Sequence, residues 1–245
     1  MRLERGGAYV PDDVLLPEHL SRYRWVAPRL KSLQVLDVGC GYGYGSDLIA
    51  AHGAERVVGL DTDPQAVAFS ARRFRRPGLS YTRSQTRAIR DGVADAVVSF
   101  EVLEHVHDAD RLVAELARLL RPGGTLFLST PNRTFTERFY VDGHSTNPFH
   151  IREYSVPEVN ALLHRSFAEV HCFQQGSPRS YWEYSDHCAI PPRFRKLVPQ
   201  SIRAAWLRFR GVGKHEPVEA FRFDPVADPA LFPTDRETQV YECRR

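Results

Sequence analysis

Cysteine is scarce in this chain, and the four cysteines that it has are widely spaced. Cys40, Cys172, Cys188 and Cys243 form no CxxC pair, so the sequence shows neither the ligand spacing of a zinc site nor a disulfide framework. Reduced, partly buried thiols are expected instead. No apolar run approaches the roughly 18 residues that a transmembrane helix needs, and the first residues lack the basic-then-apolar order of a secretory signal. We therefore expect a cytoplasmic protein without a transmembrane span.

An excess of charge of either sign is also absent. The 33 basic residues nearly balance the 30 acidic ones, which leaves a net charge of +3. Nucleic acid is therefore not an expected partner. The basic segment 193–210 has interleaved apolar residues and is compatible with a peripheral membrane contact, an acidic substrate, a partner subunit or a solvated basic face. The sequence is also compatible with a homo-oligomer.

From residue 34 onwards, short apolar runs alternate with segments of helical periodicity. This alternation is typical of a parallel sheet with crossover helices, and so of a doubly wound α/β fold. Strands are predicted at 34–38, 56–61, 79–84, 94–100, 124–130, 168–175 and 238–244.

The same pattern divides the chain into parts. Residues 1–30 are predicted to form a helical arm or lid, residues 31–175 the ligand-binding core and residues 235–245 the final strand of that core. Residues 176–234 are too long for a plain connection. This length predicts an insertion on the substrate side, which caps the site or contacts another subunit.

A glycine-rich loop follows the first predicted strand. Glycine stands at every second position from 39 to 45, just after Asp37, and such a turn lets a ligand approach the backbone. A dinucleotide fingerprint would need glycine at position 44 or 46, where Tyr44 and Ser46 stand. An acid at position 37 would repel a pyrophosphate but suits an ammonium group. The loop therefore predicts a nucleoside ligand that carries a cationic amine.

Asp61 ends the second predicted strand. A carboxylate at this place can accept hydrogen bonds from both hydroxyls of a ribose. The loop, its entry acid and the acid of the second strand come in the order that a nucleoside site requires, followed by a matching fourth strand. The alternative, in which Asp37 and Asp61 are a helix cap and a surface acid, is disfavoured.

Four segments resemble motifs of class I S-adenosylmethionine-dependent methyltransferases: VLDVGCGYGYG, VVGLDTDP, DAVVSFEVLEHV and LLRPGGTLFLSTPNR. The resemblance covers roughly residues 18–174. It implies a seven-stranded, Rossmann-like methyltransferase sheet whose last strand is antiparallel, with S-adenosyl-L-methionine as the cofactor.

The resemblance also implies which residues hold the cofactor. The loop and its entry acid would hold the methionine moiety, the second-strand acid the ribose, and the end of the fourth strand the sulfonium. Gln85 stands where many relatives have an acid for the adenine amine, and it would use its carbonyl oxygen. The implied cofactor residues are Asp37, Gly39, Gly41, Tyr42, Gly43, Asp61, Thr62, Gln85, Phe100 and Glu101.

A narrower resemblance rests on EHLSRYRWVAP before the first strand, GYG in the loop and STPNR…NPFHIRE after the fifth strand. This combination is similar to methyltransferases found with glycan and polysaccharide assembly enzymes of actinobacteria. It implies O-methylation of a sugar in polysaccharide or glycoside biosynthesis. It also places His19 and Tyr23 in a lid over the cofactor.

Methylation of a sugar hydroxyl needs a general base or a metal ion, because the hydroxyl is a weak nucleophile at neutral pH. Glu104 and His105 follow the fourth strand, where some related methyltransferases use a Glu-His pair to activate the acceptor. His144 and His150 lie in the loop after the fifth strand. We expect His144 to act as the base and His150 to be a structural or substrate contact, with a structural turn and solvated loop histidines as the alternatives. Magnesium is compatible with this pocket, although no metal motif identifies its ligands.

Three functions fit these observations. The leading one is S-adenosylmethionine-dependent O-methylation of a sugar or oligosaccharide precursor. The second is O-methylation of a quinone, phenol or other small metabolite. The third, from another class, is a non-catalytic protein that binds S-adenosylmethionine and acts by interaction. Intact acids in the loop and second strand, together with the Glu104-His105 pair, favour an enzyme.

Overall fold

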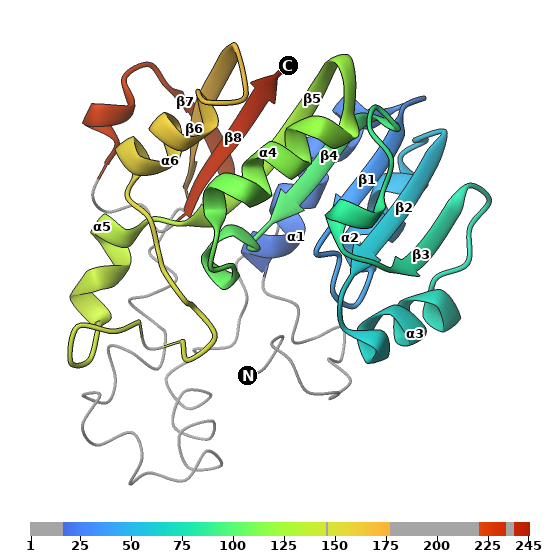
Figure 1. Ribbon diagram of the computed structural model, residues 1–245, viewed down its shortest axis with the longest axis horizontal. Coiled ribbons are helices and arrows are strands. Elements are labelled where there is room, and N and C mark those ends of the chain that lie inside the picture. Colours follow the sequence, from blue (N-terminus) through green and yellow to red (C-terminus); the bar gives the residue numbers. More distant parts are fainter. Residues whose placement is uncertain (1–16, 146, 177–220, 234–237) are drawn as a thin grey trace, which may run out of the picture.

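An eight-stranded sheet runs through the described part of the chain (Figure 1). The computed structural model describes residues 17–145, 147–176, 221–233 and 238–245. In spatial order the strands are β3-β2-β1-β4-β5-β8-β6-β7. Their bounds are β1 Gln34–Val38, β2 Arg56–Asp61, β3 Leu79–Arg83, β4 Ala94–Phe100, β5 Leu120–Pro131, β6 Glu169–Gly176, β7 Arg222–Val226 and β8 Thr238–Arg244.

Six of these strands run in one direction. β1 to β5 pair in parallel, and β8 lies antiparallel between β5 and β6, so that β6 runs the same way as β5. The predicted doubly wound fold with a reversed final strand is confirmed. The sheet has one strand more than the predicted seven, because β7, from the predicted insertion, pairs with the outer edge of β6. Pro225 obscures this strand in the sequence, but proline is tolerated at a sheet edge.

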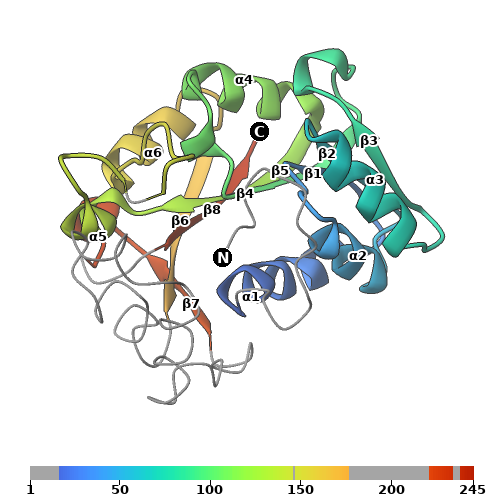
Figure 2. The same cartoon turned by 90° about the horizontal axis from the view of Figure 1, so that it is seen from below.

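Helices cover both faces of the sheet (Figure 2). On one face lie α1 Pro17–Val26, the short η2 Ala27–Leu30 and α2 Tyr44–Ala51, and on the other lie α4 Ala109–Leu119 and α6 Val156–Leu163. The helix α3, Pro64–Arg73, packs on β2 and β3. The remaining helical segments are η3 Thr86–Ala88, η4 Leu103–His105, α5 Arg133–Thr136, η5 Glu137–Phe139 and η8 Pro229–Leu231.

The sheet separates two apolar cores. Leu116 of α4 and Val159 of α6 belong to one core, and Ile49 of α2 belongs to the other. In β4, the neighbours Val97 and Val98 point to opposite faces and enter different cores, which explains why this strand reads as an unbroken apolar run. Burying each such side chain contributes roughly 1.5–3 kcal/mol to folding.

The strand order reverses between β1 and β4. β2 and β3 continue on one side of β1, whereas β5 continues on the far side of β4. In doubly wound sheets, ligands bind outside the carboxyl ends of the strands at this point of reversal. The topology therefore predicts a ligand site at the residues that follow Val38 and Phe100.

Some predicted features lie outside the described residues. They are residues 1–16 of the arm, the basic segment 193–210 and most of the insertion 176–234. Within the described ranges, no helix combines the length and apolar character that crossing a bilayer requires.

Candidate active site

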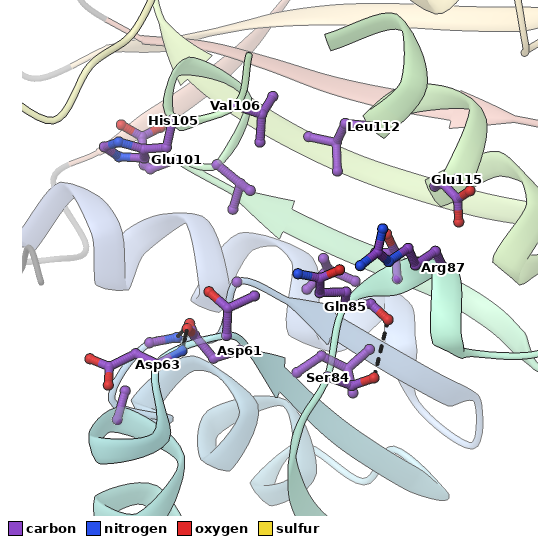
Figure 3. A pocket seen from close by; sticks show the side chains of 18 of the residues that line it. Asp61, Asp63, Ser84, Gln85, Arg87, Glu101, His105, Val106, Leu112 and Glu115 are labelled. Atoms are coloured by element: carbon purple, nitrogen blue, oxygen red, sulfur yellow. Dashed lines mark hydrogen bonds between the residues drawn. The ribbon is translucent and has the colours of Figure 1, made fainter. Parts of the chain in front are cut away.

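A cavity of about 490 Å³ lies at the carboxyl ends of β1, β2 and β4 (Figure 3). The glycine-rich loop, the end of β2 and the segment after β3 form one wall, and η4 and α4 form the opposite wall. Of the residues predicted to hold the cofactor, those that line the cavity are Gly39, Gly41, Tyr42, Asp61, Thr62, Gln85 and Glu101.

The glycine-rich loop adopts a backbone that other residues would strain. Gly39 has a φ of +77°, and a Cβ atom there would lie 2.4 Å from Cγ2 of Val102, which follows β4. The amides of Gly39 and Cys40 both donate to the carbonyl of Leu60, at 2.8 and 3.0 Å. The loop is thus pinned between the ends of β2 and β4, where the cavity begins.

Asp61 joins the glycine-rich loop to the cavity. Its Oδ2 accepts a hydrogen bond from the Gly41 amide at 2.8 Å, and its Oδ1 accepts one from the Asp63 amide at 2.9 Å. Each carboxylate oxygen can accept a second hydrogen bond, and Asp61 lines the cavity. The same carboxylate can therefore shape the loop and bind vicinal hydroxyls.

Asp37 lies beneath the loop and does not line the cavity. Its carboxylate is fully buried, with Oδ1 accepting from the Tyr23 hydroxyl at 3.1 Å and Oδ2 from the Ser46 hydroxyl at 2.6 Å. Burial raises the pKa of Asp37 to about 6, although these two hydrogen bonds oppose the rise. The contacts with α1 and α2 indicate that Asp37 organises the loop, whereas the sequence predicted a direct contact with the cofactor's ammonium group.

The raised pKa of Asp37 leads to a stability prediction. Because its pKa is about 6 in the folded protein and 3.8 when unfolded, the folded state binds more protons between these values. Stability is therefore lost as the pH rises through about 4 to 6, by roughly 3 kcal/mol in all. We expect Asp37→Asn to flatten this loss and to unfold at higher urea concentration than the wild type at pH 8. A variant less stable than the wild type at pH 8 would contradict the prediction.

Of the two residues expected in a lid, Tyr23 is packed into the core and His19 is half-buried. Tyr23 is 5% exposed, and its ring centroid lies 5.1 Å from that of Phe100. A Cβ atom at Gly45 would lie 2.1 Å from the Tyr23 ring, so α1 packs tightly under the loop. Burial lowers the pKa of the neighbouring His19 to about 3. Tyr23 and Phe100 therefore support the loop from below.

Glu101 lines the cavity and is paired with an arginine that the sequence analysis did not single out. Arg22, 1% exposed, places Nη2 3.6 Å from Oε1 of Glu101, and Ser129 donates to the same oxygen at 2.8 Å. Burial alone would raise the pKa of Glu101, but the charge of Arg22 and the other nearby donors hold it below the usual value. A negative charge is thus kept at this end of the cavity. Only packing between α1 and β4, which are distant in sequence, creates the pair.

Glu104 and His105 lie next to Glu101, in η4. Thr130 donates to Oε2 of Glu104 at 2.9 Å, and burial, with the nearby charge of Glu101, raises the Glu104 pKa well above its usual value. Nδ1 of His105 donates to the Phe149 carbonyl at 2.9 Å, and its Nε2 lies 3.9 Å from Oε1 of Glu104. His105 lines the cavity, so its imidazole can reach a ligand there.

His150 lies against His105, although it comes from the loop after β5. The two ring centroids are 4.9 Å apart at an interplanar angle of 73°. Nδ1 of His150 lies 2.5 Å from Oε1 of Glu153, a buried carboxylate that the sequence analysis also passed over. Glu104, His105 and His150 each offer one ligand atom within 4.8 Å of the others. The structure thus brings together three of the four predicted catalytic residues.

The fourth, His144, lies apart from them. It is exposed, its backbone closes a turn with Val141, and it is not among the residues that line the cavity. The sequence suggested His144 as the base because the whole loop overhangs the pocket, but the turn directs this part of the loop to solvent. His105, which lines the cavity, is the better placed imidazole, and His150 lies against it.

The end of the cavity opposite His105 suits a planar nucleobase. Gln85 lines the cavity at the end away from His105, and Thr62 and Leu112 also line it (Figure 3). Asp61 lies on the wall between Gln85 and His105. Along the cavity, Gln85 with its polar and apolar neighbours is therefore followed by the carboxylate of Asp61 and then by the imidazole of His105.

Parts of this chain are similar in sequence to known methyltransferases. Residues 36–128 match the family model of a methyltransferase domain. A probable S-adenosylmethionine-dependent methyltransferase of Mycolicibacterium smegmatis is 42% identical over 151 residues, which are 60% of this chain and 56% of the relative. A ubiquinone biosynthesis O-methyltransferase of Methylocella silvestris is 39% identical over 121 residues, or 48% of this chain and 47% of the relative. The chain thus spans about half the length of the curated relatives it matches.

A solved structure is similar over more of the chain. A methyltransferase of Thermotoga maritima superimposes with a TM-score of 0.61, covering 92% of this chain and 88% of that chain. At 15% sequence identity, this likeness concerns the fold alone. The Rossmann-like fold of methyltransferases is therefore shown by the arrangement of the sheet and by its structural neighbour.

Proposed function

We propose, from the match of residues 36–128 to the family model of a methyltransferase domain and from the similarity to a probable S-adenosylmethionine-dependent methyltransferase, that the protein methylates a hydroxyl group of a small molecule. One observation carries the proposal: a single cavity joins the glycine-rich loop and Asp61 to an imidazole end at His105. S-adenosylmethionine, when bound, supplies a methyl group on a sulfonium centre. The remaining tasks fall to the protein, which orients the acceptor, excludes water and removes a proton.

The imidazole end suits the removal of a proton from a hydroxyl. Because Nδ1 of His105 donates to a carbonyl, the acceptor lone pair of the neutral ring is on Nε2. His150 adds a second imidazole beside it. The negative charge of Glu101 lies where a sulfonium would be favoured.

Two classes of acceptor remain in the proposal. The name of the Methylocella silvestris relative supports a phenolic hydroxyl of a quinone precursor or a related small metabolite. The proposal of a sugar or oligosaccharide hydroxyl as the acceptor rests on the resemblance of the segments before β1 and after β5 to actinobacterial glycan-associated enzymes. A role limited to binding and interaction is less well supported, because the group formed by Glu104, His105 and His150 would then have no use.

A divalent cation fits the imidazole end. Oε1 of Glu104 is buried and has no hydrogen-bond partner among the described residues, and Glu104, His105 and His150 each offer one ligand atom within 4.8 Å of the others. Two nitrogen donors suit transition metals better than magnesium, which prefers oxygen. Such an ion would polarise an acceptor oxygen as a Lewis acid, and Glu104, His105 and His150 would hold it.

Labelled cofactor tests the proposal. Purified protein is incubated with methyl-labelled S-adenosylmethionine and with panels of catechol-type phenols and partially methylated oligosaccharides, before and after chelation. We expect label on the hydroxyls of one panel, and micromolar binding of S-adenosylhomocysteine by calorimetry. Absence of that binding, or tight binding of NAD instead, would refute the cofactor assignment. Binding without label on either panel would refute hydroxyl methylation.

A further inference from the structure

Gln85 and Arg87 lie side by side at the end of the cavity opposite His105 (Figure 3). Both are exposed, and neither side chain makes a hydrogen bond or an ion pair within the described part of the chain. A second hollow, of about 390 Å³, continues past these two residues, so their side chains have room to turn. Two polar side chains with unused hydrogen-bonding groups are thus available where the cavity suits a nucleobase.

The backbone that carries these two side chains is held by α4. Arg118 of α4 donates to the Thr86 carbonyl at 3.0 Å and to the Ile89 carbonyl at 2.8 Å. The amide of Ala88 donates to the Gln85 carbonyl at 3.0 Å, which closes the turn of η3. The turn is therefore fixed in place, and two movable side chains extend from it along the cavity wall.

The five carboxylates that line the cavity already have other partners. Glu115, which lines the same end of the cavity, accepts a hydrogen bond from an arginine of α4 at 2.7 Å. Asp63 and Asp108 each accept from a backbone amide in the first turn of the helix that follows them. The other two, Asp61 and Glu101, lie farther along the cavity (Figure 3). Recognition of a nucleobase is therefore left to an amide and a guanidinium group.

An amide and a guanidinium group recognise different purines. Adenine presents an amino group that donates and a ring nitrogen that accepts, and the oxygen and nitrogen of a glutamine amide match this pair. A 6-oxopurine presents two acceptors, its carbonyl oxygen and the ring nitrogen N7, and an arginine donates to both. A carboxylate can only accept, so it would place an oxygen against the carbonyl of a 6-oxopurine. The two side chains together therefore suit both kinds of purine.

We infer that the cavity binds nucleosides with either an adenine or a 6-oxopurine base, and that Gln85 recognises adenine while Arg87 recognises the 6-oxopurine. This inference rests on the proposed binding of S-adenosylmethionine. It concerns the nucleobase alone, and it is independent of the acceptor and of the group that activates the acceptor. The inosine counterpart of the product, S-inosylhomocysteine, is then a ligand of the same cavity as S-adenosylhomocysteine.

Calorimetry with these two compounds tests the inference on the wild-type protein. We expect their Kd values to lie within about tenfold of each other, whereas a site built around the amino group would reject the inosine compound by roughly 10⁴-fold. A difference larger than tenfold overturns the inference and leaves the proposed function standing. If neither compound binds, the cofactor assignment fails and the inference fails with it.

Two single variants should affect the two compounds in opposite ways. Arg87→Ala should raise the Kd for S-inosylhomocysteine by about tenfold or more, the discrimination expected of one good bidentate contact, and change the Kd for S-adenosylhomocysteine by less than about threefold. Gln85→Ala should show the reverse pattern. If each variant changes both Kd values by the same factor, or changes neither, these side chains do not recognise the nucleobase and the inference is overturned.

Arg90→Ala is the matched control for the loss of a positive charge. Arg90 is exposed and follows the same turn, but it lines neither the cavity nor the second hollow. Both Kd values should stay within about twofold of the wild type in this variant. An equal weakening of S-inosylhomocysteine binding in Arg90→Ala and Arg87→Ala would assign the effect to general charge and overturn the inference. Since all three substituted side chains are exposed, the three variants should unfold at the temperature of the wild type.

Discussion

His105→Ala is expected to lower kcat by about 10²–10⁴-fold, the range typical of removing a general acid or base. His105 is the histidine that lines the cavity, and its ring is held by the Phe149 carbonyl with Nε2 as the lone-pair nitrogen. Whether that nitrogen accepts a proton or binds a cation, its removal takes away the group that activates the acceptor. Single-turnover transfer of labelled methyl at saturating cofactor measures the loss directly.

His144→Ala is the matched control for this prediction. It removes the same kind of side chain from an exposed turn that does not line the cavity, so its kcat should stay within about twofold of the wild type. Calorimetry should give similar affinities for S-adenosylhomocysteine in both variants. If His144→Ala loses turnover and His105→Ala keeps it, the original sequence interpretation is right and the assignment made from the cavity is wrong.

Asp61→Asn should give the largest loss of cofactor affinity. The carboxylate accepts from two backbone amides while facing the cavity, and an amide nitrogen in its place would face donors. Each hydrogen bond to a charged group is worth about 1.5–3 kcal/mol. Loss of two bonds to ribose hydroxyls should therefore raise the Kd for S-adenosylhomocysteine by roughly 10²-fold or more. Calorimetry at one pH is sufficient for the comparison.

Asp95→Asn separates the binding effect from a general loss of stability. Asp95 also accepts from a backbone amide, that of Gln34, and pairs with Arg121, but it lies near the start of β4 and does not line the cavity. This variant should lose stability and keep its affinity. Equal weakening of cofactor binding in both variants would mean that Asp61 acts through the fold alone.

The sequence predicted those parts of the fold that local pattern determines. The strands that became β1, β2 and β4 are short apolar runs, which end at the glycine-rich loop, at Asp61 and at Phe100, and each leads directly into the cavity wall. The pairing order of their parallel neighbours follows from the fold class, since crossover helices leave few alternatives. β7 was missed because Pro225 interrupts its pattern and only its position at the edge of the sheet makes the proline acceptable.

The candidate site was predictable only in part, because sequence shows which residues are near a strand end but not which way they face. Asp37 and Asp61 both flank the glycine-rich loop, yet one is buried under it and the other faces the cavity. His144 and His150 share a loop, and a turn at Val141 separates their environments. Arg22 and Glu153 gain their roles from α1 meeting β4 and from the loop after β5 folding back on η4, which no local pattern specifies.

The position of β8 has a consequence for the order in which the protein is made. Residues 238–244 lie between β5 and β6, and Gln239 binds the carbonyls of Pro131 and Tyr154, the two ends of the loop that carries His150. During translation, β5 and β6 both leave the ribosome before the strand that separates them. A nascent chain that stops short of residue 238 can therefore form the half of the sheet that holds the glycine-rich loop, but it leaves the loop with His150 unanchored. Cofactor affinity should thus be acquired earlier in synthesis than methyl transfer.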